Sequence, residues 1–172
     1  VNSLKKREVE AISLHTKENN IIEVVPEAEE LGYVGIPKKI KKNTLEKILN
    51  KKQVPIISPL GLGENNQTYN INGDTAAGAI AKALKSRRLL LMTNVEGVLD
   101  KEKKLVEEIS SSEILKMIQN NTITEGMIPK INTCLDAVNN GVTAVGIIDG
   151  RKQHSVLFEI FSDKGSGTLI RK

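Results

Sequence analysis

An α/β fold, with a mainly parallel sheet sandwiched between helices, is predicted by two features of the sequence. The run Leu89–Met92 is continuously apolar, which is the pattern of a parallel strand covered on both faces. A second apolar segment of strand length, Val142–Ile148, follows later, and segments of helical length and spacing lie between and around the two. Strands separated by such helices typically build a parallel sheet with helices packed against it.

The first half of the chain is predicted to contain two helices, two strands and a tight reversal. In order, these are a helix over 4–14, a strand over 21–25 ended by Pro26, loops marked by Gly32, Gly35 and Pro37, a solvated lysine-rich loop over 38–42, a capped helix from Asn43 to about Asn50, a buried strand over 54–59 with its prolines at the ends or at an edge, and a turn or small hairpin over 61–67.

The second half alternates helices with strands. In order, it is predicted to form a helix over 76–84, a strand over 89–92, a serine-capped helix over 110–118, a helix over 128–138 stopped by Asn139-Asn140-Gly141, a strand over 142–148 and a helix over 155–161.

Composition excludes several classes of protein. Hydrophobic residues make up 39% and charged residues 27% of the chain, which favours a folded core over disorder. No apolar run approaches the roughly 20 residues of a membrane helix. The net charge is +4, but the lysines are scattered and aromatic residues are only 2%, so a nucleic-acid partner is not favoured. The single cysteine, Cys134, fits a reducing compartment, and we expect a cytoplasmic or organelle stromal or matrix protein.

Ligands of such sheets bind beyond the carboxyl ends of the strands. This rule selects four loops that are rich in Gly, Asn, Asp or cations: 70–74, 93–97, 126–130 and 149–151. No Walker-type phosphate loop is present, and Gly61–Asn66 fails the dinucleotide fingerprint because Asn66 occupies the third glycine position. His15 and His154 lack partners at metal-ligand spacing, so no protein-bound metal is predicted.

Two of these loops contain the most informative side chains. Asp74 or Thr75 can cap the helix that follows, but the asparagines around Gly73 also suit a polar ligand. Lys130 follows Pro129 at the start of a helix, where a cation is disfavoured by a few tenths to about 1 kcal/mol. A bound anion would reverse that sign, so Lys130 is interpreted as a phosphate-binding residue and Gly126 as a hinge, against the alternative of a solvated lysine.

In order and spacing, these segments resemble the N-acetylglutamate kinases of the amino acid kinase family. The resemblance covers nearly the whole chain and is carried by the following segments: 1–2, 31–35, Pro55–Pro59, Tyr69–Gly78, Thr93–Val98, Gly126–Lys130, Ile147–Arg151 and Gly165–Ile170.

The resemblance implies a phosphoryl transfer from ATP to the side-chain carboxylate of N-acetyl-L-glutamate, in arginine biosynthesis. Lys130 would contact the transferring phosphoryl group, and Asp74 would hold that lysine and a second one. Asn70, with Asn72 close by, would bind the substrate, and Mg²⁺ would be held mainly by ATP oxygens and water. Further nucleotide contacts would come from Thr93, Asn94, Val95, Gly97, Gly126 and Met127.

The resemblance also divides the chain and suggests regulation. Residues 1–73 would belong to an N-terminal substrate and oligomerisation lobe, and residues 74–172 to a C-terminal nucleotide-binding lobe. Glu159, Gly165 and Gly167 resemble part of an arginine effector site, with a plain surface loop as the alternative. A homo-oligomer is expected, and neither nucleic acid nor membrane is a predicted partner.

Several departures keep other functions open. The family usually has Asp at Asn94, a second Gly at Glu125 and Ala at Gly73, and 13–18 matches a family glycine loop only loosely. The family's first strand and glycine-rich loop have no counterpart here, so the fold is expected to be incomplete at the N-terminus and this chain alone to be inactive. The alternatives are a catalytically silent nucleotide-binding or regulatory module and a sister kinase acting on carrier-bound aminoadipate.

Overall fold

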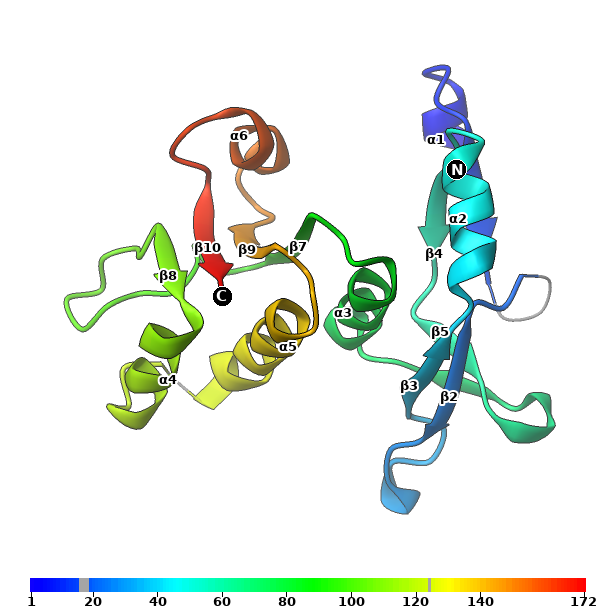
Figure 1. Ribbon diagram of the computed structural model, residues 1–172, viewed down its shortest axis with the longest axis horizontal. Coiled ribbons are helices and arrows are strands. Elements are labelled where there is room, and N and C mark those ends of the chain that lie inside the picture. Colours follow the sequence, from blue (N-terminus) through cyan, green and yellow to red (C-terminus); the bar gives the residue numbers. More distant parts are fainter. Residues whose placement is uncertain (16–18, 124) are drawn as a thin grey trace. The chain divides into compact units, whose positions relative to one another are not determined.

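The computed structural model describes residues 1–15, 19–123 and 125–172 (Figure 1). Part of the loosely matching stretch 13–18 therefore lies outside the described residues. The chain divides into two compact units, Val1–Leu84 and Lys85–Lys172. Within the described residues, no helix is long and apolar enough to cross a membrane. The resemblance places the boundary between the two lobes after residue 73, and that boundary and the roles of the two lobes stay predictions.

The first unit contains short strands around two longer helices. Its elements are α1 (Asn2–Lys5), β1 (Ala11–Leu14), β2 (Ile22–Pro26), η1 (Glu29–Leu31), β3 (Gly35–Ile40), α2 (Lys42–Asn50), β4 (Val54–Ile57), β5 (Leu60–Leu62), η2 (Glu64–Asn66), β6 (Thr68–Asn70) and α3 (Gly73–Leu84). The predicted strand near 21–25, the hairpin near 61–67 and both longer helices are confirmed.

The prediction of a helix over 4–14 was wrong beyond its first turn. The helix α1 ends at Lys5, and Ala11–Leu14 is the strand β1, which runs parallel to β4 with Ala11 opposite Val54. This pairing buries Ala11 and Leu14. The partner strand lies some forty residues away in the sequence, so the local apolar spacing could not reveal it.

Gly35 and Pro37 do not mark loops as predicted, because both lie in β3. This strand pairs antiparallel with β2 and, among the described residues, lies at the edge of the sheet β3-β2-β5-β6. A proline is tolerated at an edge, where its missing N–H is not needed by a neighbour. Lys38 and Lys39 belong to the same strand rather than to a solvated loop, and charged residues of this kind discourage edge-to-edge association.

The core of the first unit is formed by residues of α2 and α3 together with residues of β1, β2 and their neighbours. Its buried members are Leu14, Ile21, Ile22, Val24, Leu45, Ile48, Ile71 and Ala76. The strand β4 is less buried than predicted, since Val54 and Ile56 are 40% and 38% exposed. The predicted side-chain cap of α2 is also absent, because the helix begins after Lys41 without a capping hydrogen bond from that side chain.

The second unit has one sheet, in the order β7-β9-β10-β8, with helices around it. Its elements are β7 (Arg88–Thr93), β8 (Glu108–Ser110), α4 (Ser111–Gln119), η3 (Glu125–Met127), α5 (Ile128–Asn139), β9 (Ala144–Asp149), α6 (Ser155–Phe161) and β10 (Gly167–Arg171). The pairs β7–β9 and β8–β10 are parallel, and β9–β10 is antiparallel.

The sheet of this unit is covered from both faces, as the sequence predicts. The helices α5 and α6 contact β9 from opposite sides (Figure 1), and all six residues of β9 are buried. Cys134 is fully buried in α5, which confirms it as a core residue. The helix α4 begins with a capping box between Ser110 and Glu113, so the predicted serine cap is confirmed.

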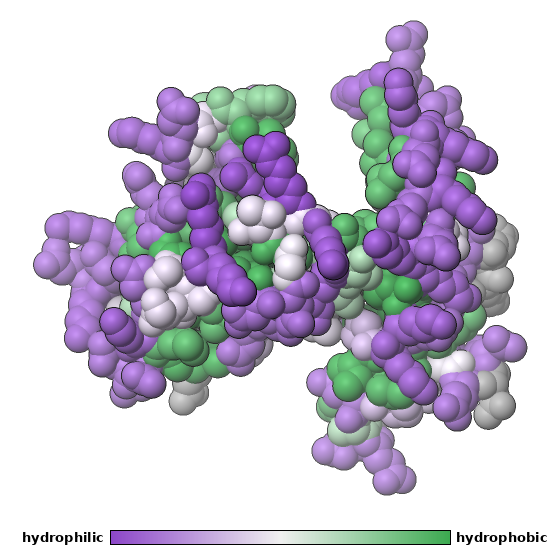
Figure 2. All heavy atoms as spheres, in the orientation of Figure 1, coloured by the Kyte–Doolittle hydropathy of each residue, from purple (hydrophilic) through white to green (hydrophobic). Residues whose placement is uncertain are grey.

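The helix α6 buries only part of its surface. Glu159 and Ser155 are buried, whereas Leu157, Phe158, Ile160 and Phe161 are each more than half exposed. These side chains contribute to the green, apolar surface over α6 in Figure 2.

Candidate functional site

Two of the four predicted ligand loops lie side by side in the second unit. The strands β7 and β9 run parallel with Thr93 opposite Asp149, so the loops that follow them begin at the same sheet edge. The backbone N–H of Gly150 donates to the carbonyl of Thr93 at 2.7 Å. An ion pair between Lys152 Nζ and Glu96 Oε1, at 3.1 Å, joins the same loops further out.

The buried side chain of Asp149 holds the loop 149–151 in place through Arg151. This side chain is 3% exposed and its carboxylate accepts hydrogen bonds from the backbone N–H, Nε and Nη2 of Arg151. The side-chain donors of Arg151 and then its backbone N–H lower the pKa of Asp149 from 3.8 to about 2. The carboxylate therefore remains charged at neutral pH and holds the Arg151 guanidinium at the end of β9.

The turn after β7 forms one wall of an apolar pocket with a volume of about 160 Å³. Three predicted nucleotide contacts, Val95, Gly97 and Met127, line it together, although Met127 comes from the separate segment before α5. The other lining residues are Val98, Leu99, Thr122 and Ile123. The other predicted nucleotide contacts do not line this pocket. Thr93 and Asn94 come just before Val95 in the sequence, and Gly126 and Lys130 lie on either side of Met127.

Lys130 lies in the first turn of α5, as predicted. The helix starts at Ile128 with Pro129 in its first turn, and that turn contains no acidic residue. The side chain of the preceding residue, Met127, makes no capping hydrogen bond. Lys130, a half-buried residue, therefore belongs to the turn that forms the positive end of the helix dipole, a position that favours binding of an anion.

The first unit contains the other predicted site residues, close together at the start of α3. Asn70 is the exposed last residue of β6. The cap of α3 is Asn72 rather than Asp74 or Thr75, since its Oδ1 accepts from the backbone N–H groups of Asp74 at 3.0 Å and Thr75 at 3.2 Å. That geometry gives Asn72 a structural role, and it places Asp74 in the first helical turn.

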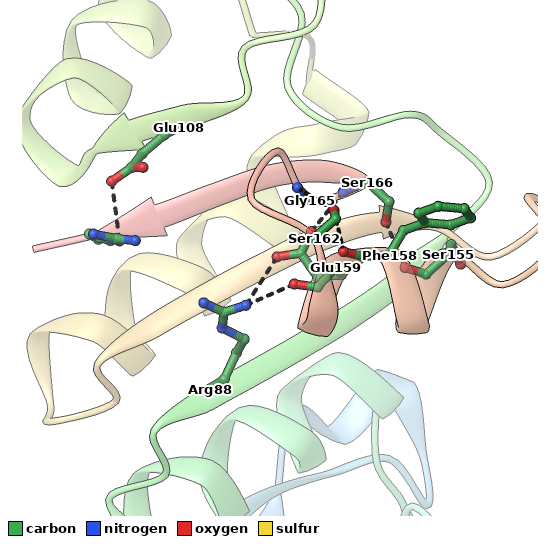
Figure 3. A network of polar contacts seen from close by, with 9 residues as sticks. Arg88, Glu108, Ser155, Phe158, Glu159, Ser162, Gly165 and Ser166 are labelled. Carbon is green, nitrogen blue, oxygen red and sulfur yellow. Dashed lines mark hydrogen bonds and ion pairs between the residues drawn. The ribbon is translucent and has the colours of Figure 1, made fainter.

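The predicted effector residues are partly brought together. Glu159 and Gly165 line a polar pocket of about 160 Å³, whereas Gly167 lies in β10 against the carbonyl of Ile147. The Glu159 carboxylate already has partners within the chain: the backbone N–H of Ser166 at 2.9 Å and Arg88 Nη1 at 3.6 Å (Figure 3). Arg88 Nη1 also donates to the Glu159 carbonyl at 3.0 Å.

Several residues around these sites were not predicted from the sequence. Arg88 lies 71 residues from Glu159, and Thr168 accepts a hydrogen bond from Val98, 70 residues away. Thr168 lies in the segment Gly165–Ile170, which carries part of the resemblance, but no local pattern indicates either contact, because only the sheet order brings the partners together. Among the described residues, no group of three or more His, Cys, Asp or Glu side chains could hold a metal ion.

Known proteins resemble the chain along its whole length. Residues 1–149 match the model of the amino acid kinase family. The chain is 55% identical over 172 residues to an acetylglutamate kinase of Pelagibacter ubique and covers 60% of its length. It is 50% identical over 143 residues to an acetylglutamate kinase of Methylobacterium nodulans and covers 47% of that protein. The chain thus spans about half to three fifths of these two relatives.

Solved structures show the same fold. A protein of Streptococcus mutans matches with a TM-score of 0.81 at 33% identity, covering 99% of this chain and 64% of that one. An N-acetylglutamate synthase of Neisseria gonorrhoeae, complexed with coenzyme A and N-acetyl-glutamate, matches with a TM-score of 0.89 at 24% identity, covering 99% and 40% of the two chains. The predicted α/β fold, with mostly parallel sheets and helices, is therefore confirmed, and the chain belongs to the amino acid kinase family.

Proposed function

We propose that this protein transfers a phosphoryl group from ATP to the side-chain carboxylate of N-acetyl-L-glutamate, which yields an acyl phosphate in the second step of arginine biosynthesis. The observation that carries the proposal is the convergence of Val95, Gly97 and Met127 on one apolar pocket. The chain's relatives of 45–55% identity are acetylglutamate kinases, and an apolar pocket of this kind suits a purine base.

The proposed mechanism relies on position and charge. The attacking carboxylate is already ionised at neutral pH, so the reaction needs no general base. Phosphoryl transfer mainly requires the in-line arrangement of donor and acceptor and neutralisation of the developing negative charge. We assign that neutralisation to the Lys130 ammonium, supported by its place in the first turn of α5. Mg²⁺ would arrive with the nucleotide and be held mainly by phosphate oxygens and water.

The acceptor substrate is assigned to the segment before α3. The Asn70 amide can donate to a substrate carboxylate and accept from an acetamide N–H. Asn72 uses its side-chain oxygen to cap the helix, so only its amide nitrogen is left for the substrate. Asp74 is proposed to orient the lysines that contact phosphate.

A catalytically silent nucleotide-binding module is the second candidate function. Asn94 favours it, because an amide there replaces the carboxylate usual in the family and removes a charge beside the nucleotide loop. Nucleotide binding is common to both candidates, so only turnover separates them.

The decisive experiment is a chimera in which this chain replaces the matching part of the Pelagibacter ubique kinase. ATP-dependent formation of acyl phosphate from N-acetyl-L-glutamate, trapped with hydroxylamine, would support the proposed kinase. Faster turnover of carrier-bound aminoadipate would instead favour the sister kinase. A folded chimera that binds ATP without turnover, beside an active parent enzyme, would leave the silent module as the function.

Regulation and assembly are further parts of the proposal. The pocket beside Glu159 is proposed to bind free arginine, because four acidic side chains line it: Glu107, Glu108, Glu159 and Asp163. Three basic side chains, Arg88, Lys164 and Arg171, line it as well. The ligand's guanidinium would have to compete with Arg88 for the Glu159 carboxylate. We also propose a homo-oligomer, which light scattering on the purified protein measures.

A further inference from the structure

The turn between β7 and the pocket is held by a residue from the far end of the chain. Thr168, near the start of β10, is fully buried, and its Oγ1 accepts a hydrogen bond from the backbone N–H of Val98 at 2.8 Å. Val98 itself is 2% exposed. A buried backbone N–H is costly to leave without a partner, so this hydroxyl satisfies a donor that water cannot reach.

Gly97 makes the same contact possible. Its φ is +149°, a backbone conformation that residues with a side chain rarely adopt. A Cβ at this position would lie 2.5 Å from Thr168 Oγ1 and 3.1 Å from Thr168 N. The backbone of the turn therefore passes directly over Thr168. A glycine at 97 and a hydroxyl at 168 together determine the path of the chain through Val98.

Thr168 is itself rigidly placed. It lies opposite Ile147 on β9 in the antiparallel pair, and its neighbour Leu169 donates its backbone N–H to the carbonyl of Glu107 at 2.8 Å. The chain that continues from Val98 turns back to it, since the backbone N–H of Val106 donates to the carbonyl of Val98 at 2.9 Å. The turn is thus attached to the sheet through Thr168 and to its own returning chain through Val106.

We propose that Thr168 is a positioning residue for the nucleotide pocket: it does not contact the nucleotide, and it holds Val95, Gly97 and Val98 in the arrangement that forms the pocket wall. This inference rests on the proposed function, which places the base of ATP in the pocket. Beyond the proposed function, nucleotide affinity then depends on Thr168, a residue that does not line the pocket.

Two substitutions isolate the hydroxyl. Thr168→Val keeps the shape of the side chain and removes the acceptor, whereas Thr168→Ser keeps the acceptor and removes a methyl group. Ile170→Val is the stability control, because Ile170 is also fully buried on β10 and lies two residues beyond Thr168. All three variants are made in the chimera described above and compared by thermal unfolding.

The first measurement is calorimetric titration with ATP and Mg²⁺ and with the nonhydrolysable analogue AMP-PNP. Removing the partner of a buried donor is worth about a tenfold change in an equilibrium constant or more. We expect Thr168→Val to weaken nucleotide binding about tenfold, and Thr168→Ser and Ile170→Val to stay within about twofold of the parent.

The second measurement is amide hydrogen exchange over 93–99, which does not depend on nucleotide. Thr168→Val should speed exchange there, and the other two variants should not. If the parent chimera binds nucleotide and Thr168→Val binds it as tightly as Thr168→Ser does, the inference is wrong. If the parent chimera itself binds no nucleotide, the proposed function fails instead, and with it the role of Thr168 in binding.

Discussion

The carboxylate of Asp149 accepts three hydrogen bonds from one residue, Arg151, at 2.8 to 2.9 Å. The two residues are separated by Gly150 alone, whose N–H donates to Thr93 on the neighbouring strand. A tight local unit therefore links the ends of β7 and β9. Because Arg151 lowers the pKa of Asp149 in the folded chain only, the folded chain binds a proton at this carboxylate less readily than the unfolded chain does, and stability depends on pH.

Asp149→Asn should remove an acid-sensitive part of the stability. The folded pKa of Asp149 is about 2, below its ordinary value of 3.8. A depressed pKa contributes stability above the unfolded value, and that contribution is lost as the pH falls from about 4 to about 2. Urea unfolding of parent and variant should therefore differ most at neutral pH and converge near pH 2. Asp163→Asn, at an exposed position, is the control, and an equal pH dependence in both variants would contradict the assignment.

Lys130→Ala in the chimera should lower kcat by about a hundredfold or more, while the KM for acetylglutamate changes little. The ammonium group is assigned to charge that develops during transfer, so its loss affects the transition state more than substrate binding. Steady-state kinetics measure both constants. Lys101→Ala, at an exposed position of the same unit, should leave both unchanged. An unaltered kcat for Lys130→Ala would remove this residue from the mechanism.

The two asparagines before α3 should behave differently when each is changed to alanine. Asn72→Ala removes the helix cap and should cost about 1 kcal/mol of unfolding free energy, and Asn72→Asp should restore most of it. Asn70→Ala should instead raise the KM for acetylglutamate and leave ATP affinity nearly unchanged. Calorimetry with each ligand, beside thermal unfolding, distinguishes the two effects. A loss confined to ATP binding would contradict the role given to Asn70.

Features encoded by local sequence were predictable, and those created by distant pairing were not. The helix α6 has the predicted bounds, and Lys130 lies in the first turn of α5, because proline and glycine signals act within a few residues. The strand β1 was mistaken for a helix, since only its ladder with β4 reveals it. The contacts Thr168–Val98 and Arg88–Glu159 join residues 70 and 71 positions apart. Asn72 was overlooked as a cap because Asp74 and Thr75 are equally suitable by composition.

Free arginine should raise the unfolding temperature of the chain more than free lysine does. A guanidinium can bind a carboxylate through two parallel hydrogen bonds, and an ammonium cannot. Thermal-shift titrations of the parent and of Glu159→Gln would measure the difference. The variant should lose the arginine-specific part of the shift. Equal responses to the two amino acids in the parent would count against an effector site at Glu159.

The glycines at 73 and 167 should respond oppositely to alanine. At Gly73, the first residue of α3, an added Cβ would meet nothing within 4 Å, and the backbone has no positive φ. Gly73→Ala should therefore stabilise the chain by about 0.4–1 kcal/mol, because alanine restricts the unfolded chain. At Gly167 a Cβ would collide with the carbonyl of Ile147, a backbone group that cannot rotate away. Gly167→Ala should destabilise by about 1–3 kcal/mol.

Chemical unfolding of both variants beside the parent checks this contrast between the two glycines. The two positions belong to different units of the chain, so two transitions are to be fitted if they separate. Gly126→Ala is the matched control in the second unit, because an added Cβ there also meets nothing within 4 Å. Tolerance of alanine at 167 to the same degree as at 126 would mean that β10 does not approach β9 as closely as described, and the anchoring of Thr168 would then need another explanation.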